Sequence, residues 1–203
     1  MANTLDTKTW KLKDILMMAI ASVIFGFIYL GFVYVGAGIT AALTPSGWGP
    51  FGYTPVYGIY FMAATFVAYI VRKPGIGIVA ELIAAIVEVL LGNFFGPGVI
   101  ISGLLQGAAC EVPFLLTRYK RWNLGTMTVS AICVAVVSFI YDMLHDSYFL
   151  YGTKMCVVMF VVRIISSIIF TGIIAKLMAD GLNKAGVLRS FAIGGKSKDL
   201  YEE

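Results

Sequence analysis

Charged residues are scarce in this chain. They make up 13% of its 203 residues, whereas a typical soluble domain carries about 25%. Apolar residues reach 60%, and the mean hydropathy is +0.90. There is no basic stripe with interleaved aromatic residues, which argues against a nucleic-acid partner. The composition instead predicts an integral membrane protein that forms a single membrane domain, residues 1–203, in contact with the lipid bilayer.

The motifs of several enzyme classes are also missing. The sequence contains neither an H-E-x-x-H zinc motif nor a G-x-x-x-x-G-K-[ST] phosphate loop, and it has one histidine. Its three cysteines, Cys110, Cys133 and Cys156, show no metal-ligand spacing and are interpreted as small buried thiols. We therefore expect a protein that is not an enzyme, carries no metal or cofactor and has no ATPase of its own.

Long apolar runs fill most of the sequence. A helix needs about 20 apolar residues to cross a hydrocarbon core of about 30 Å. Gly, Pro and polar residues separate the runs, and the first run is too long for a signal-peptide core of about 7–15 residues. The predicted fold class is an all-α integral membrane protein with six transmembrane helices, at about 15–38, 55–71, 75–91, 98–117, 124–144 and 154–179.

Basic residues alternate from one side of the predicted bundle to the other. Lys154 is the one basic residue in the predicted loops on the opposite side. By the positive-inside rule, both termini are predicted to be cytoplasmic, including a tail at 180–203. The residues that decide this orientation are Lys8, Lys11, Lys13, Arg72, Lys73, Arg118, Lys120, Arg121, Lys184, Arg189, Lys196 and Lys198.

The apolar stretch from Glu81 to Glu111 keeps three carboxylates and two amides, which are costly inside a membrane. Glu81 and Glu88 are seven residues apart, so they share one face of a helix. In the next span, Gly103 and Gly107 predict a close helix contact beside Gln106.

Depth along the spans, at about 1.5 Å per residue, separates the polar residues into two levels. In the inner level, Glu81, Glu111 and Arg163 are predicted to form structural ion pairs. The outer level predicts a small-molecule site that opens outward. Its members are Glu88, Asn93, Gln106, Asp142, His145 and Asp146.

Alternatives stay open for several of these residues. Glu88 and Gln106 could instead hydrogen-bond between helices, Asn93 could be a turn residue, and His145 a hydrogen-bonded surface group. The loops 43–61 and 141–154 are rich in aromatic residues, which anchor the membrane interface or form a lid over the site.

Residues 81–122 carry a resemblance to a known family. The pattern is Glu81-x6-Glu88-x3-Gly92-Asn93, then Gly96, then Gly103-x2-Gln106-Gly107-x3-Glu111, then Arg118-Tyr119-x-Arg121-Trp122. It resembles the YkoE family, substrate-binding S components of energy-coupling factor (ECF) transporters. The resemblance implies a multi-pass protein of the bacterial cytoplasmic membrane. It also implies binding of thiamin or its hydroxymethylpyrimidine precursor, and partnership with a transmembrane coupling subunit and two cytoplasmic ATPases.

The resemblance also suggests how the ligand and the coupling subunit would be bound. Glu88 and Gln106 would read the aminopyrimidine edge, and Asp142 or Asp146 would offset the thiazolium charge. Aromatic residues would stack on the rings: Trp48, Tyr53, Tyr57, Phe94 and Tyr148.

Many S components dock the coupling subunit through an Ala-x3-Ala motif in the first span. Here Ser22-x3-Gly26 stands in the inner half, and we expect docking there. The alternatives for the whole chain are a small secondary transporter or an S component for another vitamin.

Overall fold

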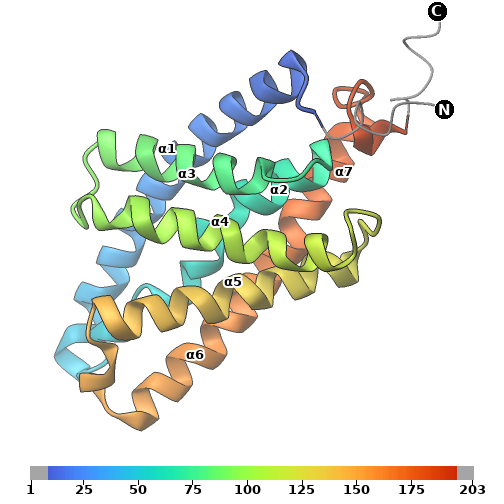
Figure 1. Ribbon diagram of the computed structural model, residues 1–203. Helices are drawn as coiled ribbons and strands as arrows, with labels where there is room; N and C mark the ends of the chain where they lie inside the picture. Colours follow the sequence, from blue (N-terminus) through green and yellow to red (C-terminus); the bar gives the residue numbers. More distant parts are fainter. Residues whose placement is uncertain (1–8, 196–203) are drawn as a thin grey trace, which may run out of the picture.

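The computed structural model describes residues 9–195, which are helical with no strand among them (Figure 1). The α-helices are α1 (Leu12–Leu43), α2 (Met62–Val71), α3 (Ile76–Leu90), α4 (Gly98–Leu116), α5 (Leu124–His145), α6 (Thr153–Ser167) and α7 (Ala175–Lys184). Short 3-10 segments lie at η1 (Thr44–Ser46), η2 (Gly49–Phe51), η3 (Thr54–Phe61), η4 (Tyr148–Tyr151) and η6 (Ala192–Gly194), and η5 (Ile168–Ile174) is a π-helical segment.

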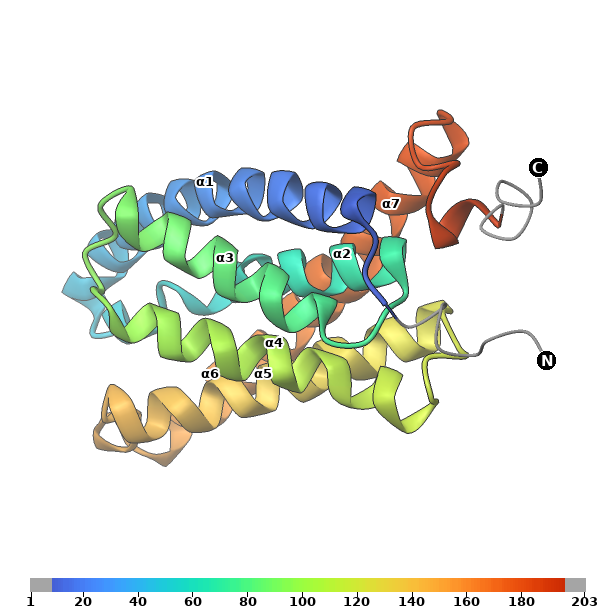
Figure 2. The same ribbon diagram turned by 45° about the horizontal axis from the view of Figure 1, so that its top comes forward.

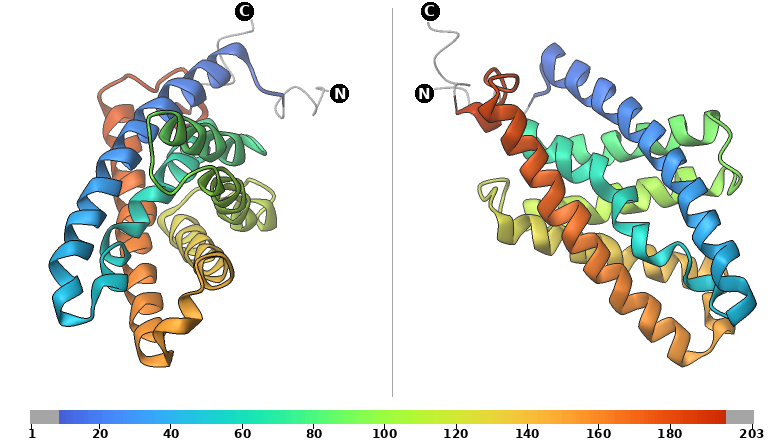
Figure 3. Two further views of the ribbon diagram at one scale, coloured as in Figure 1. Left: turned by 90° about the vertical axis from the view of Figure 1, so that its left-hand side faces the viewer. Right: turned by 180° about the vertical axis from the view of Figure 1, so that it is seen from behind.

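The helices lie side by side along one bundle. α3 packs against both α1 and α4, and α4 packs against α5. Figure 2 shows α1 above α3, with α4 and α5 following below. On the far side, α6, η5 and α7 form one continuous rod, as the right-hand view of Figure 3 shows. Every residue of α2 is buried, so this short helix is the centre of the bundle.

The predicted breaks between helices are confirmed. Gly92 has a φ of 101° between α3 and α4, and Gly152 has a φ of 82° before α6. Other residues reach this left-handed region only with strain, so glycine suits both turns. At the other end of the bundle, Asn123 caps α5 by accepting a hydrogen bond from Thr126 N at 2.9 Å.

Five helical stretches are long and apolar enough to cross a membrane: Leu12–Ser46, Gly49–Val71, Gly98–Leu116, Leu124–His145 and Thr153–Lys184. The predicted span at 75–91 is present as α3, but it has only 15 residues. A helix of that length rises about 22 Å, which is less than a full hydrocarbon core.

The second predicted span, 55–71, is divided into two kinds of helix. Its outer part is the 3-10 helix η3, which begins with Pro55 in its first turn, and its inner part is α2. This unwound outer part packs closely on α6 and η5, and it carries Tyr57 and Tyr60 toward the interior.

The beginning of α1 meets the end of α7 at one end of the bundle (Figure 1). Lys13 donates to Ser190 O, and Lys73 forms an ion pair with Asp14 at 2.7 Å. In the predicted tail 180–203, α7 continues to Lys184 and Leu188 is buried. Residues 196–203 of that tail, and Lys8 in the leader, lie outside the described residues.

The predicted docking seam on α1 needs correction. Ser22 and Gly26 are both buried, so they are not presented to another subunit. A Cβ on Gly26 would lie 2.7 Å from Val87 Cγ1 and 3.0 Å from Ala84 O. The small residues of α1 therefore allow close packing against α3 within this chain.

Candidate functional site

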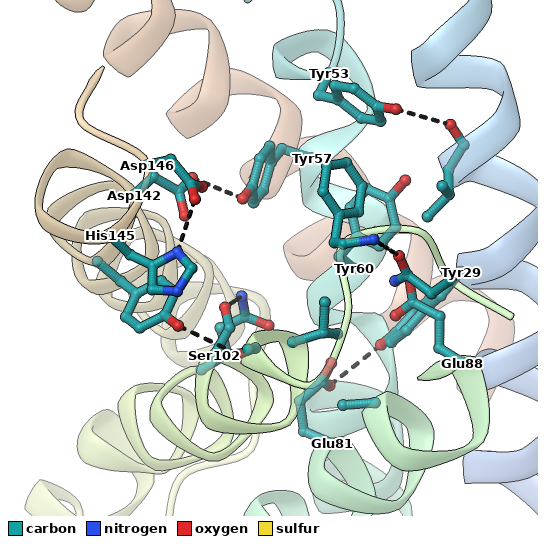
Figure 4. A pocket seen from close by; sticks show the side chains of 18 of the residues that line it. Tyr29, Tyr53, Tyr57, Tyr60, Glu81, Glu88, Ser102, Asp142, His145 and Asp146 are labelled. Carbon is teal, nitrogen blue, oxygen red and sulfur yellow. Dashed lines mark hydrogen bonds and ion pairs between the residues drawn. The ribbon is translucent and has the colours of Figure 1, made fainter. Parts of the chain in front are cut away.

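A cavity opens between the helices at the end of the bundle where the η1–η3, α3–α4 and α5–α6 connections gather (Figure 4). Its empty space, with the open mouth included, is about 820 Å³. Tyrosines and carboxylates dominate the wall. The lining residues are Tyr29, Val33, Tyr53, Tyr57, Tyr60, Glu81, Ala85, Glu88, Asn93, Phe95, Gly98, Val99, Ser102, Gln106, Tyr141, Asp142, His145, Asp146 and Tyr148.

The carboxylate and amide predicted to bind ligand are buried in this wall. Glu88 is 3% exposed and its Oε1 accepts a hydrogen bond from Asn93 Nδ2 at 2.5 Å. Asn93 Oδ1 in turn accepts from Phe95 N at 2.6 Å, so the loop after α3 orients the carboxylate. Gln106 Nε2 donates to Ser102 Oγ at 2.6 Å.

A close contact between α3 and α4 positions Gln106. A Cβ on Gly103 would lie 2.6 Å from Ala85 Cβ, and one on Gly107 would lie 2.8 Å from Ile78 Cα. The predicted small-residue contact is thereby confirmed, and both glycines face α3. Because Gln106 lies between them on the same side of α4, the close contact holds its amide in the same cavity wall as the α3 carboxylates.

Glu81 is a member of the cavity wall, which the sequence interpretation missed. Its Oε2 accepts hydrogen bonds from Ala64 N at 2.8 Å and from Tyr29 Oη at 3.2 Å. Tyr29 Oη accepts from Ala63 N at 2.8 Å, so the start of α2 fixes both groups. The seven-residue spacing from Glu88 was the signal that could have placed Glu81 in the site.

The prediction that Arg163 forms an inner ion pair with Glu81 or Glu111 was wrong. Arg163 is completely buried, and its Nη2 lies 2.7 Å from Asp142 Oδ2. Its guanidinium carbon lies 3.5 Å from the centre of the Tyr57 ring, and Tyr57 Oη donates to the same Asp142 oxygen at 2.7 Å. Asp142, Arg163 and Tyr57 thus form one buried cluster, in which Asp142 and Tyr57 line the cavity and the Arg163 charge is neutralised by Asp142.

Glu111 has a structural role of a different kind from the predicted one. It accepts hydrogen bonds from Gly75 N and Gly77 N, both at 2.8 Å, at the beginning of α3. Tyr119 Oη donates to it at 2.5 Å. The carboxylate therefore satisfies amides that a helix N-terminus leaves without a partner.

The rim of the cavity contains the predicted His145 and Asp146. His145 Nδ1 lies 2.7 Å from Asp146 Oδ1, and its ring stacks on Tyr141 with centroids 5.0 Å apart. Tyr141 Oη donates to Gly98 O at 3.2 Å, which ties α5 to the start of α4. Burial raises the pKa of Tyr148, so its hydroxyl stays protonated at neutral pH.

The aromatic predictions divide into two groups. Tyr53, Tyr57 and Tyr148 line the cavity. Trp48 and Phe94 are not among the lining residues: Trp48 meets the edge of Phe51, and Phe94 is 57% exposed against Phe95. The missed lining residues include Tyr29, Ser102 and Tyr141 in long apolar helices and Tyr60 in the 3-10 helix η3, where nothing in the pattern separates a cavity wall from a packed core.

Comparisons with known proteins agree with this geometry. A family described as "ABC-type cobalt transport system, permease component" matches residues 13–137. The "Putative HMP/thiamine permease protein YkoE" of Bacillus subtilis (strain 168) is 39% identical over 191 residues, covering 94% of each chain. The chain belongs to the YkoE family. A solved structure, "Crystal structure of an S-component of ECF transporter", matches with a TM-score of 0.87 and 38% identity, again over 94% of each chain.

Membership of the YkoE family fixes the class of protein. It is a multi-pass protein of the bacterial cytoplasmic membrane with the fold of an ECF S component. S components are non-catalytic substrate-binding subunits, and ATP hydrolysis occurs in partner subunits. Among residues 9–195, no group of three or more His, Cys, Asp or Glu side chains is placed to hold a metal ion.

Proposed function

We propose that this YkoE-family chain binds thiamin or its hydroxymethylpyrimidine precursor in the cavity described above. The name of the Bacillus subtilis relative supports this ligand class. The observation that carries the proposal is the buried pair of polar groups on facing helices, Glu88 on α3 and Gln106 on α4, inside a wall of tyrosines. A few fixed polar groups in an aromatic cavity are typical of a small-molecule site.

The chemistry of an aminopyrimidine fits these groups. A carboxylate accepts hydrogen bonds from an exocyclic amine, and a carboxamide can both donate to a ring nitrogen and accept from a neighbouring group. Tyr57 and Tyr60 supply aromatic faces for ring stacking. Glu81, Asn93 and Tyr53 complete the set around the pyrimidine, and Asp142, His145, Asp146 and Tyr148 lie toward the mouth.

In the membrane, the proposed arrangement is one domain with six crossings and both termini in the cytoplasm. α3 would count as the short sixth crossing, shielded between α1 and α4. Three basic residues at the α1–α7 end support this orientation, because basic residues favour the cytoplasmic side. Lys13 contacts Ser190, Lys73 contacts Asp14 and Arg72 contacts Trp122. The cavity then opens on the outside. A transmembrane coupling subunit and two cytoplasmic ATPases would drive release inward.

The proposal is tested by calorimetric titration of the purified, ligand-free protein in detergent. Trp48 lies outside the cavity lining, so heat is a more direct signal than its fluorescence. Saturable binding of thiamin at nanomolar concentration is the expected result. A response to hydroxymethylpyrimidine alone would move the assignment to the precursor. The absence of a binding signal with either ligand, in folded protein, would overturn the proposal.

The two polar residues have separate predictions. Glu88→Gln and Gln106→Ala are each expected to weaken binding at least about tenfold, or about 1.4 kcal/mol, because each removes a hydrogen bond to the heterocycle. The matched control for Glu88→Gln is Glu111→Gln, the same change at a buried glutamate of α4 outside the cavity lining. It should lower thermal stability and leave affinity unchanged. Unchanged affinity in a folded Glu88→Gln variant would remove that residue from the site.

The alternative of a small secondary transporter has its own test. Purified chain is reconstituted into proteoliposomes without any ATPase, and uptake of radiolabelled thiamin is followed over time. Accumulation would favour that alternative. Binding to the outer surface without accumulation is expected of an S component. Competition by an excess of another vitamin would indicate a different ligand.

A further inference from the structure

A second cavity lies next to the first and nearer the η1–η2 segment. Its empty space, again with its open mouth, is about 1020 Å³. Four residues line both cavities: Tyr53, Phe95, Asp146 and Tyr148. Glu81, Glu88 and Gln106 line the first cavity only. The first cavity is therefore an inner chamber, the second is an outer vestibule, and the four shared residues form the junction between them.

The charges along this path have one sign. The inner chamber contains the carboxylates of Glu81, Glu88 and Asp142, and Asp146 stands at the junction. Within residues 9–195, no lysine or arginine lines either cavity. The vestibule wall is otherwise made of hydroxyl, glycine, proline and aromatic residues, including Thr40, Thr44 and Tyr151.

The two aspartates near the mouth are in different electrostatic situations. Asp142 is 2% exposed and its charge is offset by Arg163 at 2.7 Å. The Asp146 side chain is 47% exposed, and it pairs with His145, which is charged only when protonated. Asp146 is therefore the more exposed of the two carboxylates near the mouth, and its partner is a histidine rather than a buried arginine.

A ligand whose pyrimidine is held by Glu88 and Gln106 must direct its other end toward this junction. In thiamin, that end is the cationic thiazolium with its hydroxyethyl group. Phosphorylation of the hydroxyl adds a charge of about −1.5 to −2 at pH 7. A phosphate at the junction would be repelled by the Asp146 carboxylate, although solvent reaches this 47% exposed side chain and weakens the repulsion.

Resting on the function proposed above, we propose that Asp146 determines specificity at the junction: it favours ligands whose outward end is cationic or uncharged and rejects their phosphate esters. The vestibule then takes the outward end of the ligand. The selected substrate class is the unphosphorylated vitamin, and a phosphatase-type reaction outside the cell must supply it from phosphorylated forms.

The test compares thiamin, thiamin monophosphate and thiamin diphosphate by calorimetry on the whole chain in detergent. The wild-type protein is expected to bind both esters at least about tenfold more weakly than thiamin. Asp146→Asn should reduce the ratio of the dissociation constants of thiamin monophosphate and thiamin at least about fivefold. The matched control, Asp180→Asn, makes the same change in α7 outside both linings and should leave the ratio unchanged.

The outcomes separate this inference from the proposed function. Wild-type affinities for thiamin and its monophosphate that agree within about threefold would overturn the inference while the function stands. A ratio that Asp146→Asn leaves unchanged would also overturn the role of Asp146. If only hydroxymethylpyrimidine binds, it is compared with its own phosphate ester in the same variants. If neither parent compound binds, the proposed function fails, and the inference fails with it.

Discussion

Replacement of Arg163 by methionine is expected to lower the free energy of unfolding by about 3–5 kcal/mol. Arg163 is among the largest fully buried side chains of the bundle, and its partner Asp142 is 2% exposed. Methionine fills similar volume, so the loss would come from leaving the carboxylate buried without its cation. Tyr57 also loses the guanidinium that packs 3.5 Å from its ring, so one wall of the cavity should loosen.

A double-mutant cycle separates the ion pair from packing. Asp142→Asn in the Arg163→Met background removes the unpaired charge and should recover more than half of the lost stability, measured by thermal and denaturant unfolding in detergent. The matched control is Lys176→Met. It breaks the partly exposed pair with Asp180, for which about 0.3–0.5 kcal/mol is expected. A double variant no more stable than Arg163→Met would show that the pair is not the source of the effect.

The position of Arg163 shows where sequence reasoning about membrane helices stops. Residue counting places a side chain at a depth, because a helix rises by a fixed amount per residue. It gives neither the rotation of the helix nor its neighbours. Arg163 was correctly predicted to be buried and paired, but α6 faces α5 and η3, so its partner is Asp142 and not a carboxylate of α3 or α4.

Small residues raise the same difficulty. Gly103 and Gly107 predicted a close helix contact, and α3 provides it. Ser22 and Gly26 gave the same pattern; both are buried and Gly26 packs on α3, although an external subunit was expected there. The pattern predicts that two backbones approach each other, because small side chains permit it. Whether the second backbone belongs to the same chain depends on the packing of the whole bundle.

The helical fold and about half of the site residues could be predicted from the sequence, because a polar residue in a membrane span indicates a position that faces the bundle interior. Each of Glu81, Glu88 and Gln106 costs free energy in lipid unless it is buried among partners, so all three were predicted to face the bundle interior. Counting depth along the spans nevertheless assigned Glu81 to an inner level, away from Glu88 and Gln106. Tyrosines carry no such penalty. Tyr29 and Tyr60 reach the cavity only because α1 and the 3-10 helix η3 turn those positions inward.

Gly58 has the second large predicted effect. A Cβ added at this position would lie 2.4 Å from Ser166 O and 2.7 Å from Ser167 Cα, both backbone atoms of α6. Neither atom can move without displacing the helix. Gly58→Ala is therefore expected to destabilise the protein by about 3 kcal/mol, at the upper end of overpacking in a core.

The same contact should link stability to binding. Gly58 N donates to Ser166 Oγ at 3.0 Å, and Gly58 O accepts from Thr171 Oγ1 at 2.5 Å. Pushing η3 away from α6 strains both bonds and shifts Tyr57, which lines the cavity. The Gly58→Ala variant, held below its unfolding temperature, should bind thiamin at least about tenfold more weakly, because its wall is displaced rather than chemically changed.

Gly38→Ala is the matched control for this last prediction. It is the same substitution in α1, at a helical position where an added Cβ would meet nothing within 4 Å. Alanine favours a helix over glycine by about 1 kcal/mol, so stability should be unchanged or slightly higher, with normal affinity. If Gly58→Ala behaved like Gly38→Ala, η3 would not be held against α6 as the structure has it. Ser166→Ala removes one hydrogen bond without adding volume. If η3 is not held against α6, this variant should also leave stability and affinity unchanged. If η3 is held there, its stability should lie between those of the two glycine variants.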